Sequence, residues 1–187
     1  GLIADAGRMM RTLLNDLLDL SKIEAGRMGV EMVDHDLRAQ VSDTVDFWRG
    51  AAEAKGLTLT LTGAERLPRW VRGDPMRLRQ VLNNLISNAV KFTTEGGVTV
   101  DIQPVAGGAS AVEIEVRDTG PGLTEAQITR LFDPYEQLGG ETARNFGGTG
   151  LGMTISRDLA RLMGGELTAS PAPEGGARFV LRLPTPA

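Results

Sequence analysis

The sequence predicts an α+β protein, a layered sandwich of helices and sheet that follows one long amphipathic helix. Three observations lead to this class. Apolar residues recur at helical spacing through the first 26 positions, strand-like segments come in neighbouring pairs, and helical segments stand between those pairs. Because strands and helices do not alternate one by one, this order favours the layered α+β sandwich over a parallel doubly wound sheet.

Length, charge and composition disfavour several classes of protein. The 187 residues suffice for one domain and a helical appendage, and no apolar run reaches the length of about 18 residues that a membrane span needs. The formal net charge is −4, with scattered basic residues, which disfavours a nucleic-acid binder. One histidine and no cysteine exclude most zinc sites and any disulfide. The start lacks the pattern of a signal peptide. We expect a cytoplasmic domain, whether or not the complete protein is membrane-anchored.

The first helix ends near Gly26, and its apolar stripe consists of Met10, Leu13, Leu14, Leu17, Leu18 and Leu20. The sequence opens inside this pattern without a cap, so we expect the helix to begin upstream. Its broad apolar face predicts an outside partner in a dimer or bundle. We therefore divide the chain into a helical segment, 1–30, and one domain, 31–187.

The first half of this domain contains two helices. One is predicted over 36–54 and ends before Gly56, and the alternating segment 57–62 predicts a strand. A short strand is expected over 69–73. Asp74 then stands at the N-cap position before Pro75, which predicts a helix to Phe92.

The second half begins with two strands that should pair, over 96–104 and 111–118. A short helix is expected over 124–131, and a mobile loop over the glycine-rich and polar stretch 139–148. A helix over 149–163 and strands over 165–171 and 177–184 complete the domain.

Three polar side chains share one face of the predicted helix 74–92. Asn84 and Asn88 are four residues apart, and Lys91 follows one further turn along. Two amide oxygens and an ammonium suit a Mg²⁺ ion and the phosphates that it bridges. The alternative is that the asparagines cap local backbone or face water.

The segment "DTGPG", 118–122, directly follows a strand. The Asp118 carboxylate can accept a hydrogen bond from an exocyclic amine such as that of adenine, and Gly120 and Gly122 let a flat base approach the backbone. Alone, the motif also fits any strand-to-helix turn.

The segment "FGGTGLGM", 146–153, leads into a helix. Its glycines free backbone N–H groups for phosphate oxygens at a helix N-terminus. It has neither a Walker lysine nor the spacing and preceding strand of a Rossmann fingerprint. A glycine-rich flexible turn is the alternative interpretation.

Taken together with "NLISNAVKFT" (84–93) and "LFDPYEQ" (131–137), these segments resemble the N, G1, F and G2 boxes of the sensor histidine kinase catalytic domain, in that order. "MGGELTAS" and "EGGARFVLRLP" resemble the closing segment of that domain, and "NDLLDLSKIEAG" resembles the second helix of the dimerisation and phosphotransfer hairpin. The amino-acid sequences of these motifs are most similar to those of hybrid-type kinases. The resemblance implies the Bergerat fold of the GHKL superfamily, whose mixed, mostly antiparallel sheet carries its helices on one face.

The resemblance also implies roles for single residues. Asn88 would bind Mg²⁺, Asn84 and Lys91 would lie near the phosphates of ATP, Phe92 would lie against adenine, and Asp118 would hold its amine, with Gly120 and Gly122 shaping the base pocket. The residues expected along the phosphates are Gly147, Gly148, Thr149, Gly150, Leu151 and Gly152. The stretch 138–147 would be the ATP lid. Its only cation, Arg144, is either a contact to the γ-phosphate or a solvated side chain. Phe132, Tyr135 and Phe146 are expected to pack the lid or, for Phe132, the core.

The implied reaction is transfer of the γ-phosphoryl group of ATP to a histidine, and then to an aspartate of a response-regulator receiver domain. Related ATPases of the gyrase, Hsp90 and MutL type usually have a glutamate where Asn84 stands, and an amide is no general base, so rapid hydrolysis is disfavoured. His35 follows the helix that an acceptor should precede, and we expect it to be a linker residue, with the acceptor on a segment outside this sequence. A GHKL-type ATPase with nucleotide-driven dimerisation and a non-catalytic nucleotide-binding module remain the alternatives.

Overall fold

The structure is a computed structural model, and it describes residues 1–106, 110–133 and 152–185. A five-stranded sheet in the order β2-β4-β5-β7-β6 forms one layer of the domain. Its strands are β2 (Thr58–Thr62), β4 (Gly97–Pro104), β5 (Ala111–Asp118), β6 (Glu166–Pro171) and β7 (Ala177–Pro184). The pair β2–β4 is parallel and the other neighbours are antiparallel, which confirms the predicted mixed sheet.

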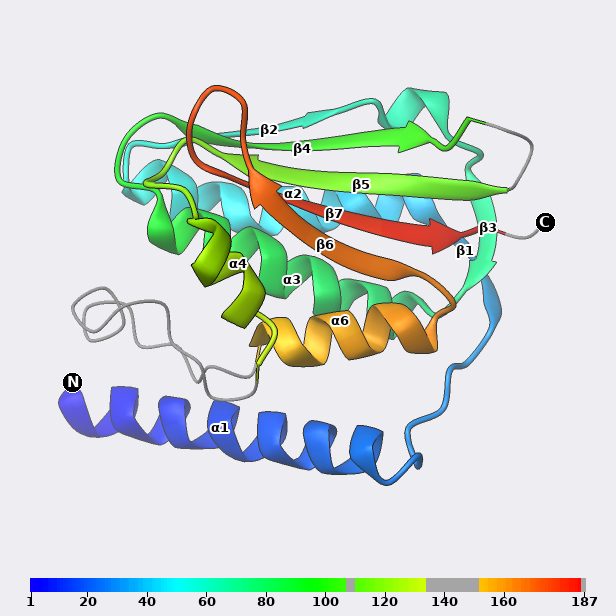
Figure 1. Ribbon diagram of the computed structural model, residues 1–187, viewed down its shortest axis with the longest axis horizontal. Coiled ribbons are helices and arrows are strands. Elements are labelled where there is room, and N and C mark those ends of the chain that lie inside the picture. The colour runs from blue at the N-terminus through cyan, green and yellow to red at the C-terminus, as the bar shows by residue number, and fades with distance from the viewer. Residues whose placement is uncertain (107–109, 134–151, 186–187) are drawn as a thin grey trace.

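The helices lie against one face of this sheet (Figure 1). They are α2 (Leu37–Ala54), α3 (Pro75–Phe92), α6 (Gly152–Leu162) and the short α4 (Glu125–Arg130). Alternation along β5 shows why: Val112, Ile114 and Val116 are fully buried toward the helices. Their neighbours Glu113, Glu115 and Arg117 point to the other face. The core therefore lies between one sheet and one layer of helices.

Helix α1 (Leu2–Glu24) runs along the outer side of the helical layer (Figure 1). Leu13, Leu17, Leu20 and Ile23 pack against the core, and the carboxylate of Asp19 accepts a hydrogen bond from Gln80 Nε2 at 2.9 Å. Leu14 and Leu18 remain 57% and 59% exposed. The domain itself therefore covers one side of the apolar stripe of α1, and only the other side would need the predicted partner. No helix among the described residues combines the length and the hydropathy that crossing a bilayer requires.

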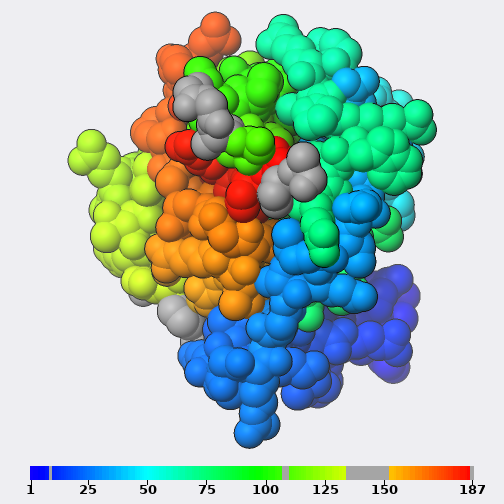
Figure 2. Space-filling view, turned by 90° about the vertical axis from the view of Figure 1, so that its right-hand side faces the viewer, coloured from blue at the N-terminus to red at the C-terminus, as the bar shows by residue number. Residues whose placement is uncertain are grey.

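The connection from α1 reaches the domain at a second, two-stranded sheet. Figure 2 views the molecule from that end and shows the connection, in blue, beside the segment that contains the second strand, in green-cyan. Strand β1 (Val33–Asp36) pairs there with β3 (Trp70–Gly73). Sequence analysis missed β1. His35 does lie in the connection just before α2, as expected, but this part of the connection is a strand. His35 is a strand residue opposite Val71, because pairing with β3 orders this polar segment.

Asp74 joins the connection to α3. Its Oδ1 accepts the N–H of Arg77 at 3.0 Å, which is the predicted N-cap bond, and its Oδ2 accepts the N–H of Glu31 at 2.9 Å. The side chain of Asp74 is buried. One carboxylate therefore both starts α3 and fixes the chain that arrives from α1.

Candidate nucleotide site

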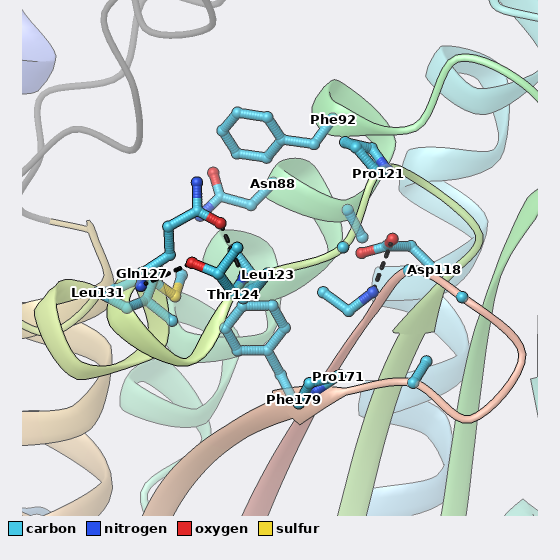
Figure 3. A pocket seen from close by; sticks show the side chains of 17 residues that line it. Asn88, Phe92, Asp118, Pro121, Leu123, Thr124, Gln127, Leu131, Pro171 and Phe179 are labelled. Atoms are coloured by element: carbon cyan, nitrogen blue, oxygen red, sulfur yellow. Dashed lines mark hydrogen bonds between the residues drawn. The ribbon is translucent and has the colours of Figure 1, made fainter.

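A cavity of about 490 Å³ opens between α3, the β5–α4 turn, α6 and the β6–β7 hairpin. Figure 3 shows Asn88 and Phe92 projecting from α3 toward it, Asp118 at the end of β5, and Phe179 and Pro171 from the hairpin strands. Its lining consists of Asn88, Ala89, Phe92, Asp118, Pro121, Gly122, Leu123, Thr124, Gln127, Leu131, Met153, Pro171, Ala172, Gly175, Gly176, Ala177 and Phe179. Segments that are far apart in the sequence thus build one mainly apolar cleft.

The two asparagines of α3 face different neighbours. Asn88 lines the cavity, and the described residues contain no hydrogen-bond partner for its carboxamide. Asn84 instead donates from Nδ2 to Ser156 Oγ at 2.9 Å and to the carbonyl oxygen of Gly152 at 3.3 Å. Residues four apart differ by about 40° around a helix, which is enough to separate the two environments. Asn84 therefore joins α3 to the start of α6, and its proposed place near phosphates stays a prediction.

Asp118 is 5% exposed at the end of β5. Its Oδ1 accepts the backbone N–H of Gly120 at 2.9 Å and that of Ala177 at 3.2 Å. Burial raises the pKa of this carboxyl, and the two backbone hydrogen bonds oppose that rise. Within the described residues Oδ2 has no hydrogen-bond partner, so one oxygen is available to a ligand in the cavity.

Glycines allow close backbone approach on both sides of Asp118. Gly122 lines the cavity at φ +78°, and Gly176 lies opposite at φ +90°. A Cβ on Gly176 would stand 1.9 Å from the carbonyl oxygen of Asp118. Gly120 lies outside the lining, but its N–H orients the Asp118 carboxylate. Gly122 and Gly176 thus bring the backbone close to the Asp118 end of the cavity. The role of Gly120 and Gly122 in a base pocket stays a prediction, and Gly176 was not predicted.

Three further predicted residues lie near the cavity without lining it. Lys91 is half-buried on α3, and burial lowers the pKa of its ammonium group. Gly152 is the first residue of α6 and accepts from Asn84. Phe132 is buried, as its predicted packing role requires, and the Arg157 guanidinium stacks 4.7 Å from the centre of its ring. The predicted residues Arg144, Gly147, Gly148, Thr149, Gly150 and Leu151, together with Tyr135 and Phe146, lie outside the described residues.

Sequence analysis missed much of the apolar wall. Leu123 and Leu131 flank α4, Met153 is in α6, and Phe179 is in β7. Alternation in "ARFVLRLP" was the available signal for Phe179, because it places that side chain on the inner face with Leu181. The Thr124 and Gln127 capping box, which starts α4 at the rim, was also readable as a T-x-x-Q pattern.

His35 belongs to a different cavity. This small second cavity is lined by His35, Asp74, Val112 and other residues beside β1 and β3. Val112 and Asp118 are six residues apart on β5, which corresponds to about 20 Å along a strand. The only histidine of the sequence is therefore far from the cavity that contains Asp118.

The chemical groups that line the cavity differ from one part of it to another. Its apolar walls suit a flat ring, the buried carboxylate at the Asp118 end suits a donor on that ring, and Asn88 offers a neutral oxygen elsewhere on the wall. The described residues contain no cluster of three or more His, Asp or Glu side chains that could hold a metal alone.

Comparison with known proteins agrees with this geometry. The family model described as histidine kinase-, DNA gyrase B-, and HSP90-like ATPase matches residues 73–187. The chain is 40% identical over 97% of its length to the sensor protein TorS of Escherichia coli (strain K12) and 43% identical over 92% to the virulence sensor protein BvgS of Bordetella bronchiseptica. It spans only 19% and 14% of these relatives.

Solved structures give the same result. Full-length ShkA, crystallised in complex with AMPPNP, superposes with a TM-score of 0.85 and 29% identity, over 98% of this chain and 38% of ShkA. The histidine kinase AdeS of Acinetobacter baumannii, at 21% identity and a TM-score of 0.76, shares the fold. The chain therefore belongs to the family of histidine kinase-, DNA gyrase B- and HSP90-like ATPases and corresponds to the catalytic domain of a sensor histidine kinase.

Proposed function

We propose that this domain binds Mg·ATP in the cavity between Asn88 and Asp118 and transfers the γ-phosphoryl group to a histidine of another segment or chain. The observation that carries the proposal is the convergence of these two side chains, from α3 and β5, on one cleft. The family match and the similarity to ShkA support adenine nucleotides as ligands.

The base would lie at the Asp118 end. There, Oδ2 of the buried carboxylate accepts the hydrogen bond of the adenine amine, while Oδ1 stays on Gly120 and Ala177. Phe92 and the apolar wall contact the ring. Guanine and uracil carry a carbonyl oxygen in place of this amine, so Asp118 would favour adenine over these two bases.

The phosphates would extend toward Asn88. Mg²⁺ prefers oxygen ligands and is commonly held by one or two protein groups together with substrate phosphates. The Asn88 carboxamide fits this requirement, because it lines the cavity and has no hydrogen-bond partner among the described residues. The ion would neutralise phosphate charge during transfer. Lys91 and the predicted residues 147–152 would complete the phosphate site, with Arg144 as the contact to the γ-phosphate.

The reaction breaks the bond between the γ-phosphorus and its bridging oxygen and forms a P–N bond to the acceptor imidazole, with ADP as the leaving group. A neutral imidazole needs little activation, whereas water needs a base. Asn84 is no base, and its amide is engaged by Ser156 and Gly152. These contacts support a kinase over the ATPase alternative.

The acceptor would come from a partner element. His35 is unsuitable because its ring lines the second cavity beside β1 and β3. The exposed apolar residues Leu14 and Leu18 of α1 support packing against another helix of a phosphotransfer hairpin, and so a homodimer of the whole protein. We further propose onward transfer to a receiver aspartate of a response regulator, in the cytoplasm where ATP is supplied.

The test supplies a phosphoacceptor hairpin in trans together with γ-labelled Mg·ATP. We expect label on the hairpin histidine, lost in acid and kept in base, and less label with an Asp118→Asn domain at ATP concentrations below saturation. Hydrolysis without labelling would favour the ATPase, and absence of nucleotide binding would favour a non-catalytic module.

A further inference from the structure

We propose that Lys55 is a positioning residue for the nucleotide site, because it fixes the end of α3 that carries Lys91 and Phe92. This inference rests on the proposed function. Lys55 follows α2, and its ammonium Nζ donates to the carbonyl oxygen of Val90 at 2.5 Å and to that of Lys91 at 2.9 Å. Lys55 is not one of the residues that line the cavity.

The C-terminal carbonyls of a helix have no partner within the helix. At the end of α3, the carbonyl of Ala89 accepts the N–H of Thr93 at 3.2 Å and its hydroxyl at 2.7 Å. The next two carbonyls, of Val90 and Lys91, are those that Lys55 satisfies. A cation near the C-terminus of a helix also interacts favourably with the negative end of the helix dipole. One side chain therefore stabilises the last turn in two ways.

That last turn borders the proposed base site. Phe92 lines the cavity, and Lys91 is half-buried beside it on the same turn. A Cβ on Gly120 would stand 3.1 Å from the carbonyl oxygen of Phe92, so the end of α3 lies close against the segment that orients Asp118. A shift of this turn therefore changes the ring contact and the carboxylate segment together.

Lys55 is the last of three links between the parallel helices α2 and α3. Gln40 Nε2 donates to the carbonyl of Pro75 at 2.5 Å, and Trp48 Nε1 donates to Asn83 Oδ1 at 2.9 Å. Each link joins residues 35 positions apart, as Lys55 and Val90 are. The row sets the register of α3 from its first turn to its last. The Lys55 link is the one at the nucleotide end.

The Gln40 link provides a matched control. It is the same kind of contact, side chain to backbone carbonyl, between the same two helices, but it lies at the first turn of α3, far from Phe92. If Lys55 acted only by holding α2 to α3, Gln40→Met and Lys55→Met should change nucleotide affinity equally. If Lys55 positions the site, only Lys55→Met should weaken binding.

The experiment measures Mg·ATP affinity by calorimetry, well below the melting temperature of each variant. Since a hydrogen bond from a charged group contributes more than a neutral one, we expect Lys55→Met to raise the Kd about tenfold. Lys55→Arg keeps a cationic donor and should stay within about threefold of wild type. Gln40→Met should lower the melting temperature and leave the Kd unchanged.

Each outcome either supports or overturns the positioning role of Lys55. A wild-type Kd for Lys55→Met, or equal losses in Lys55→Met and Gln40→Met, overturns the positioning role. If Lys55→Met does not fold, Lys55→Gln takes its place under the same criteria. Absence of binding by the wild-type chain would instead overturn the proposed function, and this inference with it.

Discussion

Asp118, at the end of β5, accepts the backbone N–H of Ala177, the first residue of the neighbouring strand β7, through Oδ1 at 3.2 Å. The same oxygen also accepts the N–H of Gly120, so the carboxylate is fixed by two backbone groups from separate segments. This arrangement leaves Oδ2 for a ligand. The orientation of this carboxylate is therefore fixed by the fold itself.

Asp118→Asn should weaken adenine nucleotide binding while keeping the fold. The amide oxygen can retain the bonds from Gly120 and Ala177, which places the NH₂ group where Oδ2 stood. Two donors then face each other at the adenine amine. We expect the Kd of ATP to rise by about tenfold or more in calorimetry. An unchanged Kd would refute the assignment.

The same substitution should change how stability depends on pH. Burial raises the folded-state pKa of Asp118, so the folded protein binds this proton more tightly than the unfolded chain does. The contribution to stability is fully present below the unfolded pKa, about 3.9, and is lost as the pH rises through the folded value. The melting temperature of Asp118→Asn minus that of wild type should therefore grow as the pH rises from about 4 to 7. A difference that shrinks over this range would contradict the burial argument.

Asn88→Ala should affect metal-dependent binding selectively. If the Asn88 oxygen binds Mg²⁺, the variant loses affinity for Mg·ATP but little affinity for ATP measured with a chelator. We expect a loss of about tenfold with the metal and less than about threefold without it. Titrations with and without Mg²⁺ check this. Equal losses under both conditions would show that Asn88 is only structural.

Adjacent glycines in the β6–β7 hairpin offer a matched pair. Gly175 and Gly176 have φ values of +94° and +90°, so alanine meets similar backbone strain at both. A Cβ at position 175 meets open space, whereas at 176 it meets the Asp118 carbonyl. Gly176→Ala should therefore be destabilised by about 1 to 3 kcal/mol more than Gly175→Ala in urea unfolding. Equal losses would mean that the close approach is unimportant.

Local signals predicted much of the fold. Helix α3 begins and ends where Asp74, Pro75 and Phe92 indicated, because the cap bond and the proline act within one turn. The pair β4–β5 was predicted as a pair, and β6 and β7 were each predicted as strands. Strand β1 was missed because its sequence, "VDHD", has no strand-like alternation, and its partner β3 follows more than 30 residues later.

The site was predictable only in part. Motif order and spacing identified Asn88, Phe92 and Asp118, which the structure brings to one cavity. Helical periodicity alone cannot separate Asn84 from Asn88, because the packing of α6 decides which asparagine it engages. The apolar wall from β7 has no polar signature, and the Lys55 contact joins side chain to backbone, which leaves no residue pattern at position 90.

The most direct test compares ATP with purine riboside triphosphate, which lacks the 6-amino group, in calorimetric titrations of wild type and Asp118→Asn. Because the amine donates to a charged acceptor, wild type should bind ATP at least about tenfold more tightly than the analogue. Asp118→Asn should lose that preference. Equal affinity of wild type for both nucleotides would contradict the claim that Asp118 holds the adenine of a bound ATP.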